Sequence, residues 1–371
     1  METNGLYNEG SAEYEKNKSR GPRKAVFYAN GNEVGFGDPL KKEKGASAPE
    51  HVQKSLESLK IDSRAGPVEG FPKFEAANLS TRTFIVITNL NLDPVFYKVF
   101  PTIKYIIVPK KRGRRKKVDT VDPNADIPDG SIITIRPPNE KVIGVDLKSV
   151  GRDGGEERGF FGNSVTFVMF VGGKKINFKV ALNGKFQMTG AKSLEQAEKC
   201  VNFFWNYVRD EQVYTLRGEY FEAYFRPVMC NIGFQLGFMI NREKLNRYFI
   251  DNFPFYPSLW ENSLGSAGAN IKIPIANPDG VQVKKIRWVE GKRMGSHISY
   301  GKLKERFPDD KKKKKGDSSE EVKYTTFLVF HRGKVNMSSM DLSIMSEPYY
   351  RFLQIIKSCR EEIEEKLTLV E

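Results

Sequence analysis

The sequence predicts an α+β protein in which one strand-and-helix unit occurs twice around an antiparallel β-sheet. Short β-rich runs joined by Gly-rich turns precede a long amphipathic helix, and the same order of elements follows again further along the chain. The segment GKFQMT (Gly184 to Thr189) also matches GKVNMS (Gly333 to Ser338) type for type. This period is too long for a solenoid repeat, so we expect a duplicated domain whose halves share one sheet or lie side by side.

The first copy spans residues 79–212. Thr83 to Leu92 is a β-branched run, and Asp93 with Pro94 can begin a short helix directly after it. A strand from Tyr105 leads into a basic loop at 109–130, and four further strands follow: SIITIRP, NSVTFVMFV, KKINFKVAL and GKFQMTG. After Gly190, apolar residues at helical spacing predict a long helix that packs on the sheet: Leu194, Ala197, Val201, Phe204 and Val208.

The second copy spans residues 213–371. It repeats the order of elements, with the strands PVMCNIGFQLGF, ANIKIPI, YTTFLVF and GKVNMS and the helices INREKLNRYFIDNF and EPYYRFLQIIKSCREEIEEKL. A polar insertion at 276–323 interrupts this half. Residues 1–78 have no sustained period, and we expect a disordered basic and polar arm with one short helix near His51 to Leu59.

Composition places limits on the class of protein. An excess of 60 Lys+Arg over 46 Asp+Glu gives a net charge of +14, which attracts polyanions such as nucleic acid or an acidic membrane. Three cysteines outside any CxxC pair and three histidines argue against a disulfide framework or a zinc site. No apolar stretch is long enough to span a membrane and the start is not a signal peptide, so we expect a soluble intracellular protein.

Strand alternation predicts which side chains lie on the sheet face opposite the helices. The apolar residues of the matched segments, Phe186, Met188, Val335 and Met337, should face the helices. The other face then carries cations, amides and hydroxyls: Lys185, Gln187, Thr189, Lys334, Asn336 and Ser338. These groups can hydrogen-bond base edges and phosphates. The alternative is a sheet that merely faces water, as many antiparallel sheets do.

Two basic runs carry weaker signals. Arg112 and Arg114, within the run from Lys110 to Lys117, can lie extended in a narrow minor groove, although such runs also serve as nuclear-targeting or phosphate-attracting segments. The run Lys311 to Lys315, flanked by aspartates, is typical of a solvated loop tip that adds salt-sensitive, non-specific affinity.

Neither half shows residues arranged for catalysis. No histidine lies near a serine or cysteine in a nucleophile arrangement, no phosphate-binding loop follows a strand, and the acidic residues are not paired at metal spacing. We therefore expect no enzymatic activity, no catalytic residue, no metal, no cofactor and no small-molecule substrate.

The stretch GKFQMTGAKSLEQAEKCV resembles the part of the TATA-binding protein family in which a Gly-Lys turn leads into the last strand and long helix of each repeat. FLVFHRGKVNMSSM resembles the same part of the second repeat. The likeness extends from about Thr83 to Leu367. With CNIGFQLGFMINREKLNRYF and KKRGRRKK, the chain is similar to the divergent members of this family from large DNA viruses.

The resemblance implies a pseudo-two-fold saddle: a curved ten-stranded antiparallel sheet, helices on its convex face, and a concave face in the DNA minor groove with four phenylalanine wedges. Phe330 matches one wedge, whereas Ala181 replaces its counterpart and the other two positions fall near Ser164 and Ala269. Gln187 and Asn336 are also polar where the family is apolar. These departures put sharp kinking and the recognised sequence in doubt.

The resemblance further implies a transcription initiation factor that binds promoter double-stranded DNA and recruits other initiation factors and RNA polymerase. Such a protein acts in a nucleus or a cytoplasmic viral factory, and a viral version can be packaged in the virion. The insertion at 276–323 is either a partner-binding element or a tolerated surface loop. The alternative function is a protein-interaction scaffold that has kept this fold and lost specific DNA binding.

Overall fold

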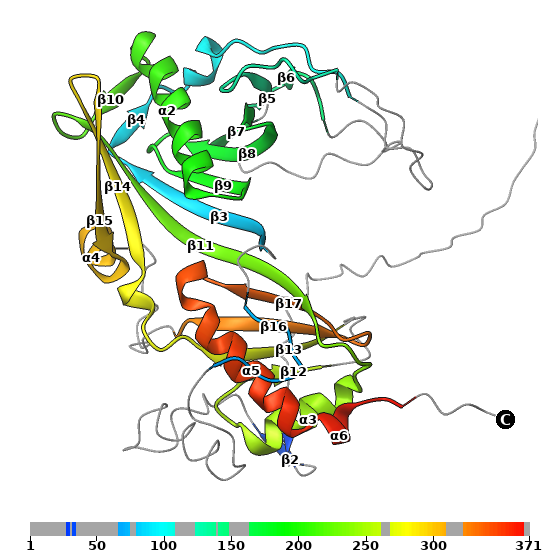
Figure 1. Ribbon diagram of the computed structural model, residues 1–371. Coiled ribbons are helices and arrows are strands. Elements are labelled where there is room, and N and C mark those ends of the chain that lie inside the picture. The colour runs from blue at the N-terminus through cyan, green and yellow to red at the C-terminus, as the bar shows by residue number, and fades with distance from the viewer. Residues whose placement is uncertain are drawn as a thin grey trace, which may run out of the picture. The chain divides into compact units, whose positions relative to one another are not determined.

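The computed structural model describes residues 27–29, 32–34, 66–74, 79–107, 123–138, 140–147, 163–260, 268–308 and 322–366 (Figure 1). The chain divides into two compact units, Met1–Ala48 and Pro49–Glu371. In the first unit, β1 (Phe27–Ala29) pairs antiparallel with β2 (Asn32–Val34). All other described elements belong to the second unit.

The first half of the second unit contains strands and one long helix in the predicted order. Its elements are β3 (Leu79–Thr88), β4 (Leu90–Leu92), the 3-10 helix η3 (Phe96–Val99), β5 (Ile132–Arg136), β6 (Ile143–Gly144), β7 (Ser164–Val171), β8 (Lys174–Ala181), β9 (Phe186–Ala191) and α2 (Leu194–Asp210). The Ser193 side chain accepts a hydrogen bond from the backbone N–H of Gln196 and so caps α2. After α2, β10 (Tyr214–Leu216) returns to pair with β4.

The second half repeats this order. Its elements are β11 (Phe221–Gln235), α3 (Arg242–Asn252), β12 (Ser258–Leu259), β13 (Gly268–Pro274), β16 (Tyr324–Phe330), β17 (Lys334–Ser339), α5 (Ser346–Ser358) and α6 (Arg360–Ile363), with short 3-10 turns η5 (Pro278–Gly280) and η6 (Leu342–Ile344). The insertion between β13 and β16 forms β14 (Gln282–Val289), β15 (Lys292–Ser299) and α4 (Tyr300–Arg306).

One antiparallel sheet joins the two halves. Its strand order is β12-β13-β16-β17-β11-β3-β9-β8-β7-β5-β6, with β14 and β15 attached at β11, which makes 13 strands. The order is symmetric about the central pair β3 and β11, because β9, β8, β7 and β5 follow β3 outward as β17, β16, β13 and β12 follow β11. The predicted α+β class and antiparallel sheet are therefore confirmed. The count exceeds the ten strands implied by the resemblance because β6, β14 and β15 are added.

The helices α2, α3 and α5 cover one face of the sheet. In Figure 1, α2 lies against the strands of the first half and α5 against those of the second. The ring of Phe204 on α2 meets that of Phe186 on β9 at 4.9 Å, and Phe352 on α5 stacks on Phe327 of β16 at 4.3 Å. Each half thus has its own apolar core between its helix and its strands.

Two predictions about single elements of the first half differ from the structure. The segment after Pro94 forms only a short 3-10 helix. Residues 105–107 do not form the strand expected from Tyr105; nearby, Thr102 makes a single parallel bridge with Ile132. The apolar residues at 105–107 belong to an irregular segment, in which the side chain of Asn124 bonds both backbone groups of Ile106.

Part of the arm at 1–78, expected to be disordered, is packed. Val68, Phe71 and Phe74 contact the core of the second half, and the Tyr349 hydroxyl donates a 2.8 Å hydrogen bond to the backbone oxygen of Pro72. Residues 66–74 therefore contradict the prediction, because apolar side chains without any period can still fill the space beside α5. The short helix expected near His51 to Leu59 lies outside the described residues.

Among the described residues, no helix is long and apolar enough to cross a membrane.

Candidate nucleic-acid interface

The sheet face opposite α2 and α5, which we call the open face, carries polar side chains on β9. Phe186 and Met188 are fully buried toward α2, while Gln187 and Thr189, which alternate with them, are exposed. The alternation expected for this strand is therefore observed. A strand with one face packed against helices leaves the other available to solvent or a ligand.

β17 has the same arrangement in the second half. Val335 and Met337 are fully buried, Lys334 is exposed, and Asn336 and Ser338 are partly exposed on the open face. The structure thus places the predicted amides and hydroxyls on one face of one sheet. Among the described residues, α4 is the helix that packs on this face, and it does so at one end, over Tyr224.

The strand register shows that the two sets occupy equivalent positions. Gln187 lies opposite Lys179 of β8 and Thr189 opposite Asn177, as Asn336 lies opposite Leu328 of β16 and Ser338 opposite Thr326. In the sequence, Asn177 and Lys179 are marked only by the alternation in KKINFKV, which predicts a polar row. The cation Lys179 takes the place that Leu328 holds in the second half, so the two halves differ in charge.

The open face of the second half is hollowed. A depression of about 460 Å³ lies over β11, β13, β16 and β17, and its lining includes Asn231, Asn270, Asn336, Ser338, Thr326 and Lys334. The amide nitrogen of Asn231 donates to the hydroxyl of Thr81 at 3.0 Å. The side-chain oxygens of Asn231 and Asn270 are buried without a hydrogen-bond partner within the described structure. A buried polar atom without a partner is costly, and in native structures it commonly bonds a water, an ion or a ligand.

Two exposed apolar side chains lie where the halves meet. A β-bulge in β11 between Pro227 and Met229 leaves Val228 39% and Met229 41% exposed. Met229 is paired with Thr83 of β3, next to the symmetry centre of the sheet. Apolar side chains of this kind act as wedges between base steps in minor-groove complexes. The sequence does not indicate that Val228 and Met229 are exposed, because the run PVMC has the composition of a buried strand.

The strand pairings of β16 with β13 and of β7 with β8 show where the expected wedge positions lie. Phe330 is partly exposed at the end of β16 and lies opposite Gly268 of β13. Ala269, near which another wedge position was expected, is fully buried among the core side chains, and its neighbour Gly268 lies opposite Phe330. In the first half, Ser164 lies opposite Ala181, and the neighbouring turn residue Leu182 is 43% exposed.

The remaining predicted residues have different outcomes. Lys185 is exposed in the turn before β9, and its backbone N–H bonds the side chain of Asn183. Arg112 and Arg114 lie outside the described residues. The run at Lys311 to Lys315 lies outside them as well.

The folded part of the insertion is bound to β11 and to α2 and is not a free surface loop. β14 pairs with residues Phe221–Phe225 of β11. On the helix side of the sheet, the indole N–H of Trp288 donates a 3.0 Å hydrogen bond to Asn202 of α2. The ammonium of Lys284 lies 2.5 Å from the carboxylate of Glu198, which is buried on α2. The expected role as a partner-binding element stays a prediction.

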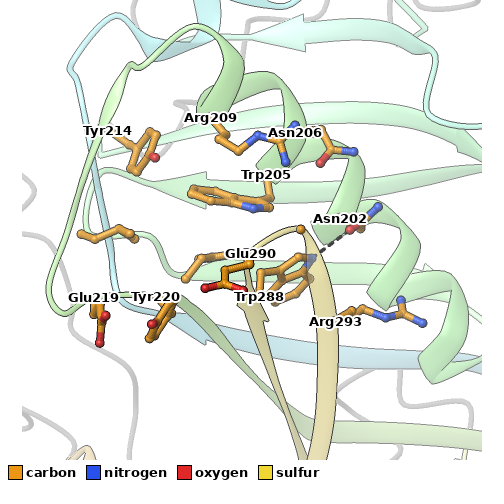
Figure 2. A pocket seen from close by; sticks show the side chains of 13 residues that line it. Asn202, Trp205, Asn206, Arg209, Tyr214, Glu219, Tyr220, Trp288, Glu290 and Arg293 are labelled. Carbon is orange, nitrogen blue, oxygen red and sulfur yellow. Dashed lines mark hydrogen bonds between the residues drawn. The ribbon is translucent and has the colours of Figure 1, made fainter.

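A groove of about 500 Å³ separates α2 from the β14–β15 turn (Figure 2). Its floor consists of three aromatic rings: Trp205 stacks on Phe221 at 4.3 Å, and Phe221 meets Trp288 at 4.6 Å. Charged and polar side chains stand around this floor, among them Arg209, Glu219, Tyr220, Glu290 and Arg293. An aromatic floor with a mixed polar rim is typical of protein-binding surfaces.

No metal-binding cluster of three or more His, Cys, Asp or Glu side chains occurs in the described ranges. The three cysteines are free and buried, and burial raises the pKa of Cys200 and of Cys359 to about 12. Thiols with such pKa values stay protonated and are poor nucleophiles.

No family model and no curated protein sequence matches the chain. Among solved structures, the chain is similar to that titled Methanococcus jannaschii TBP, with 11% sequence identity over 77% of this chain and 99% of that chain and a TM-score of 0.37. The strand order by itself establishes an α+β protein with a pseudo-two-fold antiparallel sheet.

Proposed function

We propose that this protein binds double-stranded DNA through the open face of its sheet, in the minor groove, and acts as a transcription initiation factor of the TATA-binding-protein type. One observation carries the proposal: an amide and a hydroxyl stand at equivalent positions on the open face in both halves, Gln187 and Thr189 on β9, and Asn336 and Ser338 on β17. A surface with this symmetry fits the pseudo-two-fold symmetry of a duplex. The net charge of +14 favours a polyanion.

Each residue has a role that follows from its chemistry. Lys185 and Lys334, which are both exposed, would contact phosphates. The amides can donate to the acceptors of A·T pairs or accept from the guanine amino group, and the hydroxyls can do either. Phe330 is the candidate wedge. With one such ring among four positions, we expect modest bending of the DNA. Arg112 and Arg114 would extend the contact along the minor groove.

In this role the protein performs no chemistry and needs no cofactor. We propose that it forms a DNA-bound platform that presents its helices and insertion to other initiation factors and to RNA polymerase, in a nucleus or a cytoplasmic viral factory. The narrower likeness to viral factors stays a prediction.

The test is equilibrium binding of the full chain to random and A·T-rich duplexes at several salt concentrations, measured by fluorescence anisotropy. The double variant Gln187→Glu and Asn336→Glu should weaken binding by on the order of tenfold or more, because two carboxylates would face the duplex. The control variant, Asn91→Glu with Asn206→Glu, adds the same charge on β4 and α2, away from the open face. Equal losses of duplex affinity in the two double variants would show that the binding site is not on the open face.

The groove in Figure 2 favours a second function, a protein-interaction scaffold without specific DNA binding. Its aromatic floor lies on the helix side, away from the open-face amides. The same titration separates the two functions. No affinity for any duplex at low salt would reject the DNA-binding function and leave the scaffold.

A further inference from the structure

The carboxylate of Glu222 on β11 is surrounded by three cations. Its Oε1 accepts hydrogen bonds from Lys285 Nζ at 2.8 Å and from Arg287 Nε and Nη2 at 2.8 and 2.5 Å. Its Oε2 accepts from Arg306 Nη2 at 3.3 Å and from the Tyr224 hydroxyl at 2.8 Å. Two of the cations come from β14 and the third from α4, so the insertion assembles the cluster around a strand that both halves share.

The cluster carries a surplus of positive charge. One carboxylate opposes three cations, which leaves a net charge of +2. Burial by itself would raise the pKa of Glu222, but the hydrogen bonds from Lys285, Arg287 and Tyr224 outweigh it and lower the pKa to about 2. Glu222 is therefore fully charged at neutral pH, and the net charge of +2 already includes its full negative charge.

The surplus is presented to solvent by two guanidinium groups. The Glu222 side chain is only 11% exposed, but Arg287 is 45% and Arg306 54% exposed. Glu222 occupies three N–H donors of these two groups, and a guanidinium has five. Guanidinium groups held by a buried carboxylate have lost part of their freedom already, so a phosphate that binds them loses less entropy.

Two other ion pairs on the insertion and the sheet are balanced. Lys304 of α4 lies 2.6 Å from Asp279, and Arg82 of β3 lies 2.8 Å from Asp341. Each of these cations has one carboxylate of its own. Local compensation of this kind leaves little attraction for a further anion, which makes Lys304 a suitable reference for the cluster.

The cluster lies on the open-face side of the sheet. Phe221, Ala223 and Phe225 of β11 are in the core under α2, so Glu222 and Tyr224 between them point to the opposite face. Tyr224 is paired with Ile87 of β3 and packs with α4. The surplus charge is thus at one end of the face that carries Gln187 and Asn336.

We propose that Arg287, Arg306 and Lys285, organised by Glu222, form a phosphate-binding site that takes a backbone phosphodiester of the DNA bound to the open face. This inference rests on the proposed function and adds a contact supplied by the insertion. It gives the insertion a role at the nucleic acid, on the sheet face opposite the groove of Figure 2.

The test is the salt dependence of duplex binding by the full chain. The slope of log K against log salt changes by about 0.9 for each phosphate neutralised. Arg306→Gln should reduce the slope by about that amount. It leaves Glu222 with Lys285, Arg287 and Tyr224, so the fold is retained. The double variant Arg287→Gln with Arg306→Gln should reduce it further.

The control is Lys302→Ala with Lys304→Ala, which removes two positive charges from α4 outside the cluster. We expect its slope to stay near that of the unmodified chain. The phosphate site is overturned if the chain binds the duplex but Arg306→Gln, the double variant and the control all have the slope of the unmodified chain. That result leaves the proposed function standing. Absence of duplex binding by the unmodified chain at low salt would overturn both.

Discussion

The geometry of the Gly-Lys turn before β17 explains why a glycine is needed there, and the explanation can be tested by substitution. Gly333 has φ of 72°, and a Cβ atom there would overlap the backbone oxygen of Phe238. Gly173, in the turn between β7 and β8, has nearly the same φ of 70°, but a Cβ atom there would have no atom within 4 Å outside its chain neighbours. The two glycines share the left-handed conformation and differ in the space around them.

This difference predicts different costs for Gly→Ala substitution. In Gly173→Ala only the left-handed conformation is penalised, which costs about 1 kcal/mol of unfolding free energy. In Gly333→Ala the backbone must also move away from Phe238, and we expect a total cost of about 3 kcal/mol or more. Duplex affinity should fall as well, because the turn places Lys334 and Asn336.

Urea unfolding of both variants, followed by circular dichroism, measures the two costs. Equal losses of unfolding free energy in Gly173→Ala and Gly333→Ala would refute the reasoning, because only the contact with Phe238 distinguishes the two positions.

Two further predictions concern the open face. Phe330→Ala should reduce the bend of bound DNA, measured by energy transfer between labelled duplex ends, and should cost at most a few kcal/mol of binding free energy. Phe330→Leu keeps an apolar wedge and should bend the DNA as the unmodified chain does. An unchanged bend in Phe330→Ala would show that the ring is not a wedge. Because the pKa of Glu222 is about 2 in the folded chain and 4.5 is its ordinary value, its contribution to stability is complete above about pH 4.5 and is lost as the pH falls toward 2. Glu222→Gln should flatten this part of the profile of unfolding free energy against pH, and profiles of the same slope in both proteins would contradict the assignment.

Local patterns predicted the strands that carry the candidate site. The alternation in GKFQMT and GKVNMS, the Gly-rich turns and the helical spacing after Gly190 each depend on neighbours in sequence, and the structure has these elements within a few residues of the predicted bounds. β11 was the exception, since it begins at Phe221 and continues through Pro227. A proline suggests a strand boundary, but here the bulge after Pro227 accommodates it.

The insertion could not be placed from its sequence. β15 is exposed along most of its length, so it has no alternation to detect, and the polar composition of the segment suggested a loop. Its pairing is decided by Ile286 and Trp288, which join the core of the first half. The cluster around Glu222 likewise depends on contacts between residues 65 and 84 positions apart. Contacts between residues so far apart in the sequence cannot be predicted from local patterns.

The fifteen-residue strand β11 has a consequence for how the chain folds. β11 pairs with β3, β14 and β17, and its register with β3 joins Thr88 to Ala223 across the whole first half. The hairpins inside each half can form early, whereas the β3–β11 pairing must wait for a long loop to close. Until then both strands present open edges, as would either half produced alone, and open edges recruit other chains. We expect isolated halves to self-associate through these edges, and the full chain to lose this tendency in the step that pairs β3 with β11.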